Sequence, residues 1–194
     1  TQGVSSAASD VYKRQIGSRL VTHQSGPSGL PVTSVLVEEV RPIAREFYLC
    51  LLIDRASGRV RLMASASGGM DIEAVAAEDP SRIVSVEVHP AAGLQPFHGR
   101  VLAEALELTG DRLSAFQAVL KGLYALALEK DLLQIEINPL ILDDSGQLLA
   151  LDAKIVADDN ALGLHPDLQA FRDVGQEDAA EARARDLDLS YVTL

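Results

Sequence analysis

The most regular pattern of hydrophobic and polar positions in this chain lies between residues 132 and 156. Residues 132–142 are mostly Leu and Ile, and polar residues stand at every second position among them: Gln134, Glu136 and Asn138. A period of two is typical of a strand, because successive side chains of a strand point to opposite faces. Residues 143–146 are turn formers, and the chain becomes mainly apolar again over 148–156. The pattern predicts two antiparallel strands joined by a turn.

This hairpin brings acidic side chains together if its turn centres on Ser145. Asn138 then lies opposite Asp152, and Glu136 shares the face of Asn138. A shift of one residue would place Asp152 on the other face. Two neighbouring carboxylates repel each other, whereas Mg²⁺ accepts oxygen ligands from one or two carboxylates and from phosphates. The pattern is consistent with a Mg²⁺–phosphate site, and also with a hairpin whose acidic side chains are solvated.

The same periodicities predict further elements along the chain. Strands are expected at 32–39, 47–53, 60–66 and 83–88. The second and third of these form a hairpin, since the turn between them contains Gly58. Helices are expected at 71–77, 100–108, 111–130 and 177–186, the third with an apolar stripe that belongs to the core. A break is expected at 165–167. Strands and helices in this mixture indicate an α/β fold.

Composition excludes several classes of protein. The chain has 17 Lys and Arg against 28 Asp and Glu, a net charge of −11, which argues against a nucleic-acid partner. Residues 1–31 lack the apolar core of a signal peptide. The sequence also contains no run of about 18 apolar residues, the length that a membrane span requires. The single cysteine, Cys50, excludes an internal disulfide and fits a reducing, cytoplasmic location.

The histidines do not indicate a metal site, and they form no identifiable Ser/His/Asp or Cys/His arrangement. His23, His89, His98 and His165 are scattered without metal-ligand spacing. All four are interpreted as surface or loop residues.

Several motifs resemble the ATP-grasp fold, and most closely the β subunit of succinyl-CoA synthetase. The resemblance rests on EINPL at 136–140, LDAK at 151–154, VLVEEVRPIAREFYL at 35–49, MASASGGMDIE at 63–73 and DDNALGLHPD at 158–167. It implies an ATP-grasp large lobe, with a mainly antiparallel sheet packed by helices. It also implies roles for five residues. Asn138 and Asp152 would hold Mg²⁺, Glu136 would face a phosphohistidine of the partner subunit, and Glu38 and Glu46 would contact the nucleotide.

The resemblance implies an ATP-dependent carboxylate–CoA ligase subunit that acts on succinate, with Mg²⁺ and ATP as cofactors and GTP as the alternative nucleotide. The expected partner is an α subunit that carries the phosphohistidine and the CoA site. A malate–CoA ligase β subunit would share these motifs. An acidic interaction domain without catalytic chemistry is the alternative outside enzymes.

The resemblance covers roughly residues 32–194 and gives an expected domain organisation. Residues 1–31 are predicted to lie outside it and to be disordered, and the stretch VSSAASDVYKRQ predicts that residues 1–15 are not native sequence. Residues 32–165 are expected to be a partial ATP-grasp nucleotide-binding domain. Residues 166–194 are expected to be a connector toward a CoA-ligase domain. On this interpretation the chain is a fragment, truncated at both ends and inactive alone.

Overall fold

The computed structural model describes residues 13–21, 27, 29–173, 175, 177, 179–185, 187 and 189. The chain divides into two compact units, residues 41–169 and residues 1–40 with 170–194. We call them the sheet unit and the terminal unit. This division differs from the boundaries expected at residues 32 and 166, which remain sequence-based predictions.

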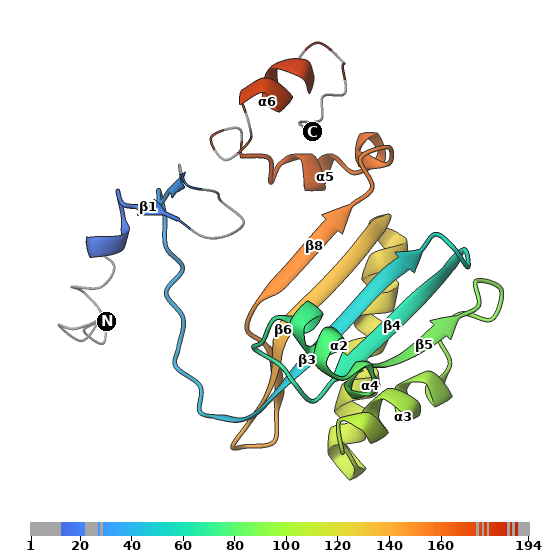
Figure 1. The fold of residues 1–194 in the computed structure, drawn as a ribbon. Coiled ribbons are helices and arrows are strands. Elements are labelled where there is room, and N and C mark those ends of the chain that lie inside the picture. The colour runs from blue at the N-terminus through green and yellow to red at the C-terminus, as the bar shows by residue number, and fades with distance from the viewer. Residues whose placement is uncertain are drawn as a thin grey trace. The chain divides into compact units, whose positions relative to one another are not determined.

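The sheet unit is built on six antiparallel strands (Figure 1). Their order is β5-β4-β3-β6-β7, and β8 also pairs with β6. The strands are β3 (Ile43–Asp54), β4 (Arg59–Ser65), β5 (Val84–Val88), β6 (Leu132–Asp143), β7 (Leu148–Ala150) and β8 (Ala153–Ala157). The expected fold class, a mainly antiparallel sheet packed by helices, is confirmed.

The β3–β4 hairpin forms where the turn chemistry predicted it. Asp54 Oδ1 accepts a hydrogen bond from Ala56 N at 3.0 Å, and Gly58 adopts a φ of 65°. Positive φ favours glycine because it has no side chain to clash with the backbone. The register pairs Ile53 with Val60, so the apolar residues of both strands fall on one face.

Helices α3 (Pro96–Ala105) and α4 (Gly110–Glu129) cover that apolar face, and Figure 1 shows them on the side of the sheet opposite α2. The core between sheet and helices contains fully buried side chains from both, among them Phe47, Leu49, Leu62, Leu102 and Phe116. Helix α3 begins four residues before its predicted start, because Pro96 occupies its first position, where a missing N–H costs nothing.

His98 corrects the interpretation of the histidines as surface or loop residues. It lies inside α3 with only 4% of its surface exposed. Its Nδ1 accepts a hydrogen bond from Gln95 N at 2.9 Å. The ring therefore caps the helix from within, which satisfies a backbone donor at the helix start.

The short helix α2 (Ile72–Glu78) follows a Gly-Gly loop and begins at the predicted acidic residue. Asp71 is its N-cap and accepts hydrogen bonds from Glu73 N and Ala74 N. The 3₁₀ helix η1 (Pro80–Arg82) then leads into β5.

After β8 the chain forms the 3₁₀ helix η2 (Leu162–Leu164) and the helix α5 (Pro166–Gln169). Of the predicted break at 165–167, only His165 lies between them, since α5 already starts at Pro166. Two contacts hold this segment to the residues after α4: Lys130 Nζ lies 2.8 Å from Asp167 Oδ2, and His165 Nε2 lies 2.8 Å from Asp131 Oδ2.

The terminal unit contains a two-stranded antiparallel sheet of β1 (Arg19–Leu20) and β2 (Leu30–Pro31), and the helix α6 (Ala179–Arg185) within the predicted charged segment. The expectation of disorder over 1–31 stays a prediction, and the described part of that range contributes both strands of this sheet. Residues 1–12, on which most of the expected non-native stretch falls, lie outside the described residues.

The strand predicted at residues 32–39 is wrong. The described residues 32–42 form neither helix nor strand, and Leu36 and Val37 are 84% and 70% exposed. A β-branched sequence favours an extended backbone, but a strand also requires a partner for its hydrogen bonds. Among the described residues no strand pairs with this segment.

Candidate functional site

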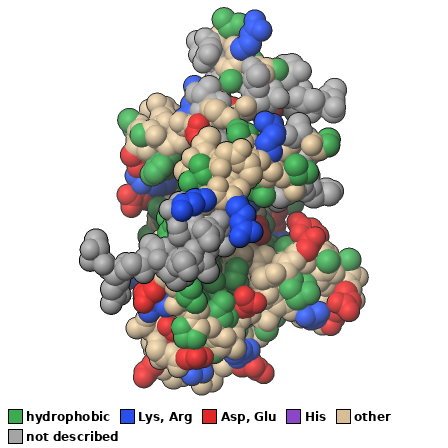
Figure 2. Space-filling view, turned by 90° about the vertical axis from the view of Figure 1, so that its left-hand side faces the viewer, with side chains coloured by type: hydrophobic (Ala, Val, Ile, Leu, Met, Phe, Trp, Pro, Cys, Tyr) green, Lys and Arg blue, Asp and Glu red, His purple; other side chains and the backbone are tan. Residues whose placement is uncertain are grey.

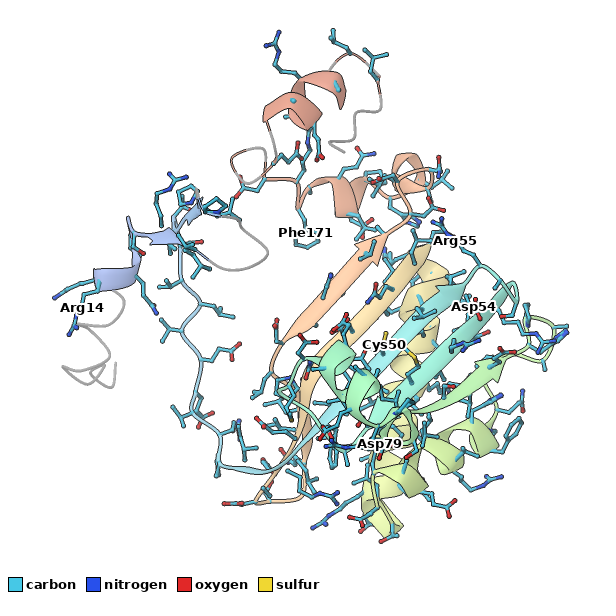
Figure 3. All side chains as sticks on the ribbon, in the orientation of Figure 1. Arg14, Cys50, Asp54, Arg55, Asp79 and Phe171 are labelled. Carbon is cyan, nitrogen blue, oxygen red and sulfur yellow. The ribbon has the colours of Figure 1, made fainter. Side chains whose placement is uncertain are left out.

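The face of the sheet opposite α3 and α4 carries the polar residues of the central strands. Alternation along β3 places Tyr48 and Cys50 on it, while Leu49 and Leu51 point into the core. On β6 the register sets Glu136 beside Cys50. We call this the polar face. Figure 3 shows Cys50 in the middle of the sheet.

The predicted register of the central hairpin is confirmed. Strand β6 pairs Leu140 with Ala150 on β7 and Ile137 with Ala153 on β8. The intervening position sets Asn138 opposite Asp152, and Asn138 N donates to Asp152 O at 3.3 Å. The alternative register, with Asp152 on the other face, is excluded. Convergence of the two side-chain oxygens on one cation stays a prediction.

A β-bulge interrupts β6 at Asn138 and Pro139, and the sequence analysis missed it. Strand β3 pairs Phe47 with Leu140 but Leu49 with Ile137, so β6 has one extra residue between them. Ile137 and Leu140 therefore both reach the core, although they are three positions apart. Pro139 was the available signal, since proline inside a sheet is found mainly at edges and bulges.

The Asn138 side chain is held at both ends of its amide. Its Oδ1 accepts a hydrogen bond from Gly69 N at 2.7 Å, and its Nδ2 donates to Met70 O at 2.8 Å. A backbone N–H only donates and a carbonyl only accepts, so these partners fix which amide atom points which way. The oxygen retains a second lone pair.

The Gly-Gly loop also touches Glu46. Gly68 N donates to Glu46 O at 3.3 Å. A Cβ on Gly69 would lie 2.9 Å from Glu46 Oε2, so this carboxylate packs directly on the Gly69 Cα. The loop thus brings Glu46 and Asn138 together. Glu38, by contrast, is an exposed residue of the terminal unit, within the segment that has no regular structure.

Glu136 is half-buried, and its neighbours include an amide, a lysine, a thiol and a phenol. Gln134 Nε2 donates to its Oε2 at 3.0 Å, and the register sets Lys154 of β8 opposite it. Burial raises the pKa of the Cys50 thiol to about 11. Burial also raises the pKa of Tyr48, and the nearby Cys50 and Glu136 add to that shift. The two groups beside Glu136 therefore stay neutral at physiological pH.

The donor set suits a hard cation. Asn138 offers an amide oxygen, and Asp152 is exposed, with no hydrogen bond or ion pair to its carboxylate among the described residues. The part of the chain that the structure describes has no cluster of three or more His, Cys, Asp or Glu side chains that could hold a metal. Mg²⁺ could be held here only with further ligands, such as phosphate oxygens and water.

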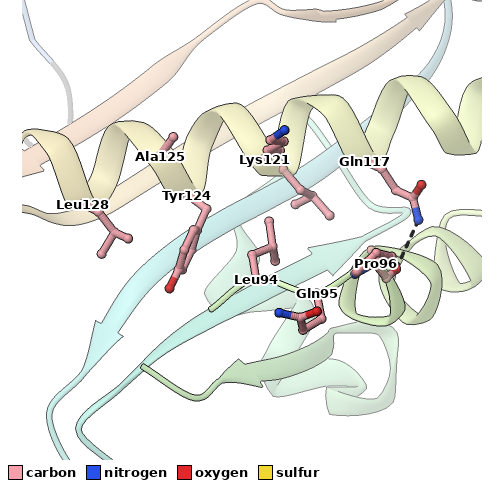
Figure 4. Close-up of a pocket in the computed structure, with 10 residues that line it drawn as sticks. Leu94, Gln95, Pro96, Gln117, Lys121, Tyr124, Ala125 and Leu128 are labelled. Atoms are coloured by element: carbon pink, nitrogen blue, oxygen red, sulfur yellow. Dashed lines mark hydrogen bonds between the residues drawn. The ribbon is translucent and has the colours of Figure 1, made fainter. Parts of the chain in front are cut away.

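A hollow lies on the helix-covered side of the sheet. It is an apolar groove of about 450 Å³ between the loop before α3 and the helix α4 (Figure 4). Leu94, Leu120 and Tyr124 line it, and Gln117 Nε2 donates to Pro96 O across it at 3.1 Å. The groove belongs to the opposite side from the polar face.

Acidic residues outnumber basic ones in this chain, 28 to 17. Figure 2 shows acidic and basic side chains interspersed over the face that it presents. Among the described residues, no helix has the length and apolar composition required to cross a membrane.

The fold and the motifs on the polar face define a family. The family model for the ATP-grasp domain matches residues 3–142, and this chain belongs to that family. The matched range includes most of residues 1–31, which corrects the expectation that this segment lies outside the resemblance.

The resemblance to the β subunit of succinate–CoA ligase is also confirmed. The chain is 54% identical over 179 residues to "Succinate--CoA ligase [ADP-forming] subunit beta" of Thioalkalivibrio sulfidiphilus, which covers 92% of this chain and 46% of that protein. It is 48% identical over 187 residues to the subunit of the same name from Cereibacter sphaeroides (strain ATCC 17025), covering 96% of this chain and 47% of that protein. The chain spans about half the length of these relatives.

Solved structures support the fold alone. ATP citrate lyase from Methanothrix soehngenii, solved in complex with citrate and coenzyme A, superimposes with a TM-score of 0.65 at 16% sequence identity. The match covers 94% of this chain and 41% of that chain.

Proposed function

We propose that this chain is the nucleotide-binding part of the β subunit of an ADP-forming succinate–CoA ligase. The whole enzyme would convert succinate, CoA and ATP to succinyl-CoA, ADP and phosphate. The observation that carries the proposal is the register that sets Asn138 opposite Asp152. The high identity to relatives of that name supports the substrate assignment.

Asn138 and Asp152 would hold Mg²⁺ together with the phosphates of ATP. The second lone pair of Asn138 Oδ1 supports this assignment, as does the Asp152 carboxylate, which has no partner within the part of the chain that the structure describes. When bound, the cation would neutralise charge on the phosphates, which is a main requirement of phosphoryl transfer. The two side chains would orient it.

Glu46 and Glu38 would bind the nucleoside. The position of Glu46 beside the Gly-Gly loop, next to the residue that would hold the metal, supports its part in the same nucleotide site. ATP is the proposed nucleotide, with GTP as the alternative.

Glu136 would orient the histidine of an α subunit while that histidine carries the phosphoryl group. Only one of its carboxylate oxygens is engaged by Gln134, which leaves the other for an imidazole N–H. The neutral Tyr48 and Cys50 beside it add no competing charge at physiological pH.

The test uses the complete gene product with an α subunit from the same source. Formation of succinyl-CoA is followed with succinate, CoA and Mg-ATP, and malate replaces succinate in a parallel assay. Asp152→Asn should weaken Mg-nucleotide binding and slow turnover, because it removes a charged metal ligand. Asp144→Asn, an exposed neighbour in the hairpin turn, is the matched control and should leave both unchanged.

Three outcomes are informative. Equal kinetics of the Asp152 variant and the unmodified protein would contradict the metal assignment. Turnover with malate in place of succinate would assign the protein to malate–CoA ligases. Absence of Mg-ATP binding would favour an acidic interaction domain.

A further inference from the structure

Two glycines between β4 and α2 contact both groups that would bind Mg-ATP. Gly69 donates its backbone N–H to Asn138 Oδ1, and the carboxylate of Glu46 packs on its Cα. Asn138 lies on β6, Glu46 on β3, and Gly69 in the loop that leads into α2. The loop is thus the direct link between a metal ligand and a nucleoside ligand.

The observed position of the loop backbone depends on its two glycines. A Cβ on Gly68 would lie 2.3 Å from Phe47 N, so only glycine permits this close approach to β3. Gly69 has a φ of 67°, a conformation that other residues rarely adopt. Asp71 fixes the other end of the loop by capping α2.

We propose that Gly69 is a positioning residue that sets the Asn138 amide and the Glu46 carboxylate relative to each other. Its N–H orients the oxygen of Asn138 toward the cation, and its missing side chain leaves room for Glu46. Metal binding and nucleoside binding are coupled through this one residue. This inference rests on the proposed function of Asn138 and Glu46.

The test compares Gly69→Ala with Gly58→Ala in the complete gene product. Gly58 has nearly the same φ, 65°, but a Cβ there would meet nothing within 4 Å. Both variants therefore impose the same backbone strain, and only one displaces Glu46. Binding of a fluorescent ATP analogue is titrated against Mg²⁺ at equilibrium, and thermal unfolding is recorded for each variant.

Gly69→Ala should raise the Mg²⁺ concentration for half-maximal nucleotide binding by about 10- to 100-fold, the usual effect of disturbing a group that orients a metal ligand. Alanine keeps the backbone N–H, but its methyl group would displace the Glu46 carboxylate or move the N–H away from Asn138 Oδ1. Gly58→Ala should change it by less than about 2-fold. Both melting temperatures should fall because both variants carry the backbone strain of a positive φ, and that of Gly69→Ala should fall further because its methyl group also meets Glu46. Equal Mg²⁺ dependence of the two variants would overturn the proposal.

A second pair of variants covers the case in which Gly69→Ala fails to fold. In a protein that already carries Glu46→Ala, the methyl group added by Gly69→Ala has no carboxylate to displace. The double variant should therefore fold, and Gly69→Ala should lower the Mg²⁺ affinity much less in it than in the unmodified protein. The same loss in both backgrounds would contradict coupling through Glu46. Asp152→Asn serves as the reference. If Asp152→Asn leaves the Mg²⁺ dependence unchanged, the proposed function fails. If Asp152→Asn changes the Mg²⁺ dependence and Gly69→Ala does not, only the role of Gly69 is refuted.

Discussion

The buried thiol of Cys50 should make the stability of the sheet unit depend on alkaline pH. The thiol is 1% exposed in the middle of β3, and burial raises its pKa from an ordinary value of 9.0 to about 11. The folded protein therefore holds this proton more tightly than the unfolded chain does. The resulting stabilisation is fully present below pH 9 and is lost as the pH rises toward 11.

The size of the effect follows from the two pKa values. At pH 8 the thiol is mostly protonated in both states, whereas at pH 10 it is mostly ionised only in the unfolded chain. The unmodified protein should lose about 1 kcal/mol of unfolding free energy between these pH values on account of Cys50. Cys50→Ala lacks this contribution, so its stability deficit relative to the unmodified protein should shrink by that amount.

Urea unfolding at pH 8 and pH 10, followed by far-UV circular dichroism, measures the difference. The chain has no tryptophan, and ionisation of tyrosine would disturb fluorescence at pH 10. Leu51→Ala is the matched control, since Leu51 is the adjacent buried residue and does not titrate. Its deficit should be the same at both pH values. If Cys50→Ala and the unmodified protein lose stability in parallel, the thiol is not held neutral by burial and the reasoning is refuted.

Three further predictions concern the core, the hairpin turn and the metal. Phe116→Ala should lower the unfolding free energy by about 3–5 kcal/mol, because it leaves a cavity in the core. Leu164→Ala, at an exposed position, should change it by less than about 0.5 kcal/mol. Equal urea midpoints of the two variants would contradict the packing of Phe116. The Ser145 hydroxyl and Gln147 N–H lower the pKa of Asp143, so the advantage of the unmodified protein over Asp143→Asn in urea midpoint should be present at pH 7 and decline as the pH falls through the folded pKa. An advantage that does not decline as the medium is acidified would exclude this cause. Excess EDTA should abolish the Mg²⁺-dependent part of nucleotide binding without altering the circular dichroism spectrum, and loss of secondary structure on chelation would indicate a structural metal instead.

The local patterns of the sequence determined much of the sheet unit. The period of two over residues 132–142 and the turn formers at 143–146 predicted the central hairpin and its register, which the pairing of β6 with β7 and β8 confirms. Gly58 marked the β3–β4 turn, and Asp71 marked the start of α2. These features could be predicted because strand alternation, turn chemistry and helix capping depend on residues close together in the chain.

The tertiary structure alone decided where those elements meet. The strand predicted at 32–39 did not form, since strand propensity cannot supply a partner for the hydrogen bonds. The bulge at Pro139 is defined by the register between β6 and β3, because the residue pairs on either side of the bulge both join these two strands. The hydrogen bond from Gly69 to Asn138 joins residues 69 positions apart, and no local period contains such a contact. The sequence therefore determined which residues share a face of each strand, while packing of the Gly-Gly loop against β3 and β6 decided which of them touch.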